Sequence, residues 1–149
     1  MMRERFPLVR PLVAAVTLLG GLLGAAALLS DRVPVWLGIA RSRVDAPDWF
    51  PWALDDTNFH LALWFGLTLL ATLAVRTTRA RLLVGATAAV VGPVVEYLQL
   101  KWTFTRQFEM SDVMANTRGV YLGLLVGLVA GAVADALEAR RSPAAPDGA

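Results

Sequence analysis

The residues best suited to chemistry lie around the junction of two long apolar runs in the second half of the chain. Glu96 and Gln99 close the first of these runs, and Asp112 and Asn116 open the second. Polar groups between apolar segments of membrane length are costly unless they pair with each other or face water, so by default they indicate a functional site. The short stretch between the runs adds Arg106, Glu109 and Ser111.

A second polar position comes from an earlier apolar run. His60 is the single histidine of the chain and the only titratable side chain within residues 58–75, and Asp56 precedes it by four residues. If the runs cross a membrane alternately, His60, Glu96 and Asp112 all reach the same side at the same depth. We therefore expect three segments that are distant in sequence to build one shared site.

The elements that must position these residues are predicted to be membrane helices. Hydrophobic residues make up 56% of the 149 residues and charged residues only 17%, which is too apolar for an ordinary soluble domain. Cysteine is absent, which excludes disulfides, thiolate metal sites and a cysteine nucleophile. The arginines lie at the ends of apolar runs and form no basic stripe, which favours membrane topology and argues against a nucleic-acid partner.

We predict an all-α integral membrane bundle of four transmembrane helices. The predicted spans are residues 11–29, 58–75, 82–100 and 113–134, within a membrane domain of residues 11–137. Each is close to the roughly 20 residues that cross a bilayer. Residues 1–10 form a basic head, residues 138–149 a disordered tail, and residues 30–55 a connecting loop. Two short apolar parts of that loop, 33–39 and 49–52, are expected at the bilayer interface. The alternative for the first run is a signal peptide cleaved near Ala25 to Ala27.

Basic residues near the span ends predict the orientation. The head, the turn containing Arg76, Arg79 and Arg81, and the Arg140-Arg141 pair fall on one side of a four-span protein. Because basic residues accumulate on the cytoplasmic side, we expect a multi-pass protein of the bacterial inner or plasma membrane with both termini in the cytoplasm. The polar site then faces outwards.

Small residues predict how the last span packs. Gly119, Gly123, Gly127 and Gly131 recur every four residues, so they share one face of a helix with Asn116 and let a neighbour approach closely. This stripe suits packing inside one bundle as well as a dimer, and the sequence leaves the oligomeric state open.

Several chemistries suit the polar residues. Glu96, His60 and Asp112 offer general acid and base groups, with Glu96 as the catalytic candidate and His60 as its proton partner. Arg106, with amide donors from Gln99 and Asn116, suits a phosphate or carboxylate, and Asp56 and Glu109 complete the candidate ligand-binding residues. A metal held by His60, Glu96, Glu109 and Asp112 has no compact ligand motif to support it, so we predict neither metal nor cofactor. Ser111 is a weak nucleophile candidate that a helix cap explains.

The positions of these residues resemble the pattern of the VanZ-like family of small bacterial membrane proteins. The matching residues are Asp56, His60, Glu96, Gln99, Arg106, Asp112, Asn116, Gly119 and Gly123, within residues 55–134. Thr57 departs from the pattern, because the family usually has a lysine there. The resemblance implies a polytopic membrane fold and a cell-envelope context, and the family's namesake is associated with low-level teicoplanin resistance. No reaction is firmly assigned to the family.

Two functions from different classes remain open at this point. One is a cell-envelope protein that binds or modifies an anionic, lipid-linked envelope ligand at the outward-facing site, with membrane lipid as a partner. The other is a non-catalytic membrane scaffold whose polar cluster only locks its outer loop. A transporter is disfavoured, because paired broken helices and a path through the bundle are not evident.

Overall fold

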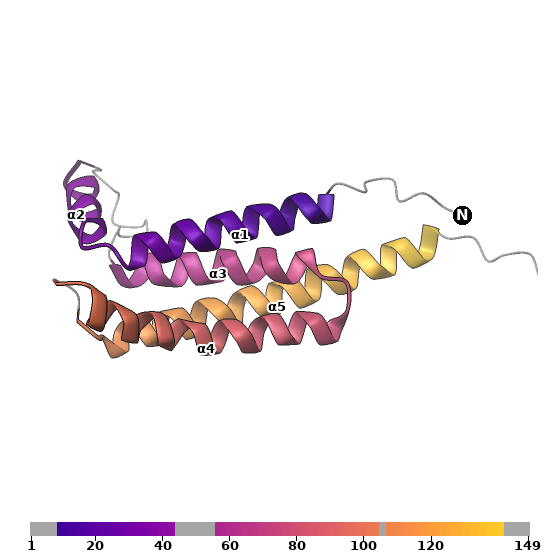
Figure 1. Cartoon of the computed structure of the whole chain (residues 1–149). Coiled ribbons are helices and arrows are strands. Elements are labelled where there is room, and N and C mark those ends of the chain that lie inside the picture. The colour runs from indigo at the N-terminus through magenta and orange to yellow at the C-terminus, as the bar shows by residue number, and fades with distance from the viewer. Residues whose placement is uncertain (1–8, 44–55, 105–106, 142–149) are drawn as a thin grey trace, which may run out of the picture.

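The computed structural model describes residues 9–43, 56–104 and 107–141, and these form an all-helical bundle (Figure 1). Four of its five helices are long and apolar enough to cross a membrane, which confirms the predicted fold class. The helices are α1 (Val9–Leu28), α2 (Val33–Arg43), α3 (Asp56–Ala74), α4 (Thr78–Trp102) and α5 (Met110–Arg141).

The observed spans begin and end a few residues from the predicted ones. Thr77 caps α4, since its side chain accepts a hydrogen bond from the Ala80 amide. This helix therefore starts inside the expected basic turn, and Arg79 and Arg81 belong to its first turns. At the C-terminal end, α5 continues to Arg141. Residues 138–141 are therefore helical, although we expected the disordered tail to begin at residue 138.

The connection between the first two spans differs from the expected loop. Residues Val33–Arg43 form the helix α2, which is crosswise to α1 beyond the end of that helix and projects away from the bundle (Figure 1). Eleven residues rise only about 16 Å, so α2 does not span a bilayer. Its Trp36 and Val35 are exposed, which suits the interfacial position expected for residues 33–39. The second apolar part of the loop, 49–52, lies outside the described residues.

The glycine stripe of α5 packs on α3. A Cβ atom at Gly119 would lie 2.5 Å from the Leu61 carbonyl oxygen, and one at Gly123 would lie 2.5 Å from the Phe65 carbonyl oxygen. Further along, Gly127 faces the Thr72 side chain and Gly131 lies against the Arg81 guanidinium. The stripe therefore brings two backbones within the bundle into contact, as small residues do in membrane helices.

Two further contacts join the other helices, one between α1 and α3 and one between α4 and α5. Gly24 of α1 is buried, with Leu63 of α3 only 2.9 Å from where its Cβ would be. At the other end, the buried Arg81 of α4 donates from Nη1 to Asp135 Oδ2 of α5 at 3.1 Å. In Figure 1, α1 begins and α5 ends at this same end, and the α3–α4 turn lies there too. The α4–α5 connection and α2 lie at the opposite end, where the polar residues gather.

Candidate functional site

The polar residues singled out in the sequence come together at the α2 end of the bundle. His60 near the start of α3, Glu96 and Gln99 near the end of α4, and Asn116 near the start of α5 are each at most 1% exposed. Asp112, in the first turn of α5, is 4% exposed. Buried polar side chains require hydrogen-bond partners, and most of these residues find them in one another.

His60, Asn116 and Glu96 form the centre of this cluster. The imidazole Nδ1 of His60 lies 2.9 Å from Asn116 Oδ1 and 3.0 Å from Glu96 Oε1. Asn116 also donates from Nδ2 to Glu96 Oε1 at 2.8 Å. Because both neighbours of Nδ1 are acceptors, this nitrogen carries the proton, and one carboxylate oxygen receives donors from α3 and α5 together.

Asp112 faces the opposite edge of the same imidazole ring. Its Oδ2 lies 3.7 Å from His60 Nε2, and its Oδ1 accepts a hydrogen bond from the Thr57 hydroxyl at 3.0 Å. His60 therefore lies between two carboxylates, with a hydroxyl donor orienting the second. Thr57 thus supplies a neutral donor to the Asp112 carboxylate.

Gln99 ties the cluster to the first span. Its Nε2 donates to the Leu28 carbonyl oxygen at the end of α1 at 2.7 Å. Two buried acceptor atoms of the cluster have no hydrogen-bond partner among the described residues. They are the other amide atom of Gln99, Oε1, and the second carboxylate oxygen of Glu96, Oε2. Buried polar atoms without partners are rare, because each costs about 1–3 kcal/mol of unrecovered solvation. Both atoms accept and neither donates, so the arrangement suits a ligand that presents hydrogen-bond donors.

Of the other predicted site residues, one is exposed outside the cluster and two have side chains that lie outside the described part of the chain. Glu109 is exposed, and its carboxylate accepts from the Ser111 hydroxyl at 3.4 Å, away from His60. Arg106 lies outside the described residues, and so does the side chain of Asp56, whose backbone begins α3. The cluster in the structure therefore consists of Thr57, His60, Glu96, Gln99, Asp112 and Asn116.

Two contributors to the site were missed by reasoning from the sequence. Thr57 was considered only as a departure from the family pattern, although it directly follows Asp56 and lies three residues before His60, which places it on the His60 face of a helix. The Leu28 carbonyl carries no sequence signal at all, because any residue at the end of α1 would offer the same oxygen.

The geometry of the cluster suits a hydrogen-bond network better than it suits a bound metal ion. His60, Glu96 and Asp112 each offer a ligand atom within 4.8 Å of the others, a donor set that suits a divalent metal. However, the two carboxylates face different edges of the imidazole ring, and Glu96 Oε1 already accepts from Asn116. His60 contacts both carboxylates, so the three groups are placed to exchange protons through its imidazole ring.

The fold and the cluster together define a multi-pass helical membrane protein with a buried histidine–carboxylate–amide site at one end of its bundle. Comparisons with protein-family models, curated proteins and solved structures find no match.

Proposed function

We propose that this protein is a cell-envelope membrane protein of the VanZ-like type that binds or modifies a lipid-linked envelope ligand at the His60–Glu96 cluster. In this proposal the chain lies in the bacterial plasma membrane with both termini in the cytoplasm and the cluster at the outer end. The spacing of the polar residues in α3, α4 and α5 supports the family resemblance, and the resemblance supplies the envelope context, including glycopeptide resistance.

The observation that carries the proposal is the pair of buried acceptors without partners, Glu96 Oε2 and Gln99 Oε1. A ligand hydroxyl that reached Glu96 Oε2 would donate to it, and the carboxylate would act as the general base for that proton. Before the transfer, His60 would stabilise the negative charge of the Glu96 carboxylate through Nδ1, which contacts its other oxygen. Asn116 and Asp112 would hold the imidazole in place from its two edges.

A non-catalytic scaffold is the second candidate, and one observation favours it. His60, Glu96 and Gln99 are each 0% exposed, and together with Asn116 they connect all four spanning helices through their hydrogen bonds. Such a network would fix the relative positions of the helices and of the outer connections even if no ligand reached it.

The substitution Glu96→Gln separates the two candidates. Glutamine keeps an oxygen to accept from Asn116 and His60, but it loses the carboxylate base. If the site acts on a ligand, cells producing the variant lose teicoplanin resistance to the level of cells without the protein, while its amount in the membrane and its thermal stability remain close to those of the unmodified chain. The control is Glu109→Gln, an exposed carboxylate outside the cluster.

Retention of resistance by Glu96→Gln would rule out the acid–base role. A scaffold role instead predicts a loss of stability, because a buried ion-pair member that is removed typically costs about 3–5 kcal/mol.

A further inference from the structure

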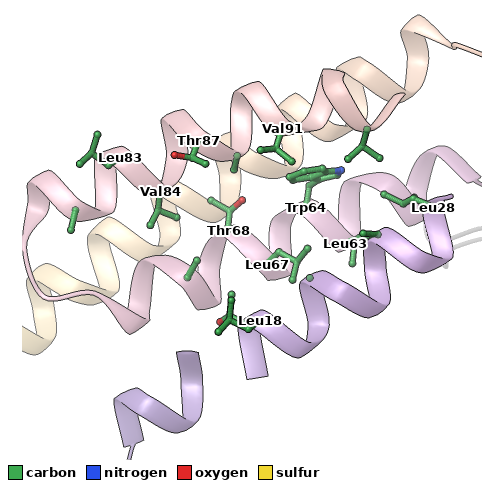
Figure 2. Close-up of a pocket in the computed structure, with 17 residues that line it drawn as sticks. Leu18, Leu28, Leu63, Trp64, Leu67, Thr68, Leu83, Val84, Thr87 and Val91 are labelled. Carbon is green, nitrogen blue, oxygen red and sulfur yellow. The ribbon is translucent and has the colours of Figure 1, made fainter. Parts of the chain in front are cut away.

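Two apolar surfaces of the described chain are open. The first is a groove of about 630 Å³ between α1, α3 and α4, lined mainly by aliphatic side chains and by Trp64 (Figure 2). Its lining contains no charged residue, so it selects nothing beyond the hydrocarbon that surrounds any membrane helix. The second surface is one face of α2, and it differs from the groove because charged side chains accompany it.

The open face of α2 carries an exposed apolar stripe between two arginines. Trp36 and Ile39 are three residues apart, so they share a face of the helix, and they are 61% and 46% exposed. Arg43 follows on the same face as the last residue of α2, and Arg32 directly precedes the helix; both are exposed. The stripe therefore has a guanidinium group near each end.

These two arginines are available to bind an anion. Among the described residues, neither guanidinium group is paired with a carboxylate. The eleven residues of α2 contain no acid. The adjacent Asp31 is turned towards α4, where both of its carboxylate oxygens accept from the Phe104 amide, at 3.0 and 3.2 Å. The charge and polarity of α2 thus complement a surface that is negatively charged outside and apolar beneath.

The position of α2 places this face at the edge of the bilayer. The first span ends at Leu28, and α4 ends at Trp102, which is 67% exposed. Tryptophan is enriched where a span leaves the hydrocarbon, and the bonds between Asp31 and Phe104 hold the start of α2 level with that end of α4. Because α2 is crosswise to α1 and projects away from the bundle, it extends along the bilayer surface over lipid (Figure 1).

We propose that α2 binds the anionic phospholipid headgroups of the leaflet beside it. Trp36 and Ile39 lie at the boundary between headgroups and acyl chains, and Arg32 and Arg43 bind lipid phosphates, whose oxygens fit the guanidinium fork. Interfacial helices bind through buried apolar area and attraction to anionic lipids together. This inference is independent of the ligand of the polar cluster and of which leaflet lies at that end of the bundle.

Electron paramagnetic resonance of the full-length chain in lipid nanodiscs tests the proposal. The chain has no cysteine, so Ile39→Cys attaches one nitroxide label, and the label is itself apolar. In bilayers of phosphatidylcholine mixed with phosphatidylglycerol, we expect this label to be immobilised, accessible to oxygen and shielded from a water-soluble nickel chelate. In phosphatidylcholine alone, the mobile and water-exposed component of the spectrum should grow.

A label on the other side of α2 shows whether one face binds the bilayer. Gly38 is two residues after Trp36 and therefore lies about 200° around the helix. A Cβ at Gly38 meets nothing within 4 Å, so Gly38→Cys accepts the label without displacing a neighbour. This label should remain accessible to the nickel chelate in both kinds of bilayer.

The charge dependence separates headgroup binding from simple burial of the apolar stripe. Measured with the Ile39→Cys label, Arg43→Gln should lower the ratio of immobilised to mobile α2 in the anionic bilayer roughly fivefold, as the loss of one arginine from an anionic surface implies. Salt at about 1 M should also lower it, because the screening length falls to about 3 Å. The matched control is Arg79→Gln, an exposed arginine at the other end of the bundle, which should leave the ratio unchanged.

Equal ratios in the two bilayers, or an anionic preference that survives both Arg43→Gln and high salt, would overturn the proposal. Immobilisation of the Ile39→Cys label in detergent micelles without phospholipid would also overturn it, because α2 would then pack against protein. None of these outcomes changes the test of Glu96→Gln, so the inference and the proposed function fail separately.

Discussion

At the residue scale, Asn116 holds the polar cluster together. Its side chain contacts both His60, at 2.9 Å, and Glu96, at 2.8 Å, and it does so with its two different amide atoms. An amide is suited to this position because it both donates and accepts. A carboxylate or an aliphatic side chain of similar size could satisfy only one of these partners or neither.

We therefore expect Asn116→Leu to destabilise the bundle by about 1–3 kcal/mol, because it leaves a buried carboxylate oxygen and a buried imidazole without their partner. The measurement is equilibrium unfolding in detergent micelles. Thr117→Val is the matched control, since Thr117 is exposed and only bonds back to Val113 of its own helix. A loss confined to the control would contradict the role given to Asn116.

Thr57 offers a second test at this scale. Thr57→Val should cost about 1 kcal/mol, because the hydroxyl donor to Asp112 is lost while the shape is kept. Thr57→Lys keeps a donor for the same carboxylate and should unfold at nearly the same denaturant concentration as the unmodified chain. A lysine variant less stable than the valine variant would show that position 57 cannot contact Asp112 through a longer side chain.

At the scale of elements, the α3–α5 contact positions the site. Gly119 and Gly123 allow the α5 backbone to approach Leu61 and Phe65 of α3, and this approach places Asn116, less than one turn before Gly119, against His60. The site geometry therefore depends on glycines that take no part in its chemistry.

We expect Gly123→Ala to destabilise the protein by about 1–3 kcal/mol, because its Cβ would meet a backbone oxygen that cannot move without shifting α3. Gly66→Ala should be neutral or stabilising by up to about 1 kcal/mol, because its Cβ meets nothing and alanine favours a helix. Thermal unfolding of both variants under one set of detergent conditions makes the comparison. Equal stabilities would mean that α3 and α5 are not in contact at Gly123.

At the scale of the whole molecule, the two ends of the bundle differ in character. One end carries the buried cluster, the exposed α2 and the α4–α5 connection, and the other carries the Arg81–Asp135 ion pair and the α3–α4 turn (Figure 1). An even number of spans places the start of α1 and the end of α5 together at the second end. The orientation of this molecule in a membrane decides which ligands can reach the cluster.

The chain lacks cysteine, so single cysteines report this orientation directly. In intact cells, an impermeant thiol reagent should label Gln107→Cys, at the cluster end, and should fail to label Thr78→Cys at the α3–α4 turn; both positions are exposed. Cell lysis should make the second site reactive. The opposite labelling pattern would put the cluster in the cytoplasm and remove the envelope ligand from the proposed function.

The sequence by itself determined the four spans, their helical character and the residues at which polar groups interrupt them, because hydropathy and helix length are local properties. Spacing also predicted that His60, Glu96, Asp112 and Asn116 lie at one end, since alternating spans return to the same side. Sequence reasoning treated residues 30–55 as a connection and missed α2, whose eleven residues combine a proline, a glycine and two arginines.

Only the tertiary structure decided which polar atoms meet. Glu96 Oε1 contacts Asn116 and His60, whereas Oε2 has no hydrogen-bond partner in the described chain. This difference depends on how α3, α4 and α5 pack, and packing is not a local property of the sequence. The same holds for the Leu28 carbonyl under Gln99 and for the groove beside Trp64. Side-chain type fixes what a residue can bind, but the geometry of neighbouring helices fixes what it does bind.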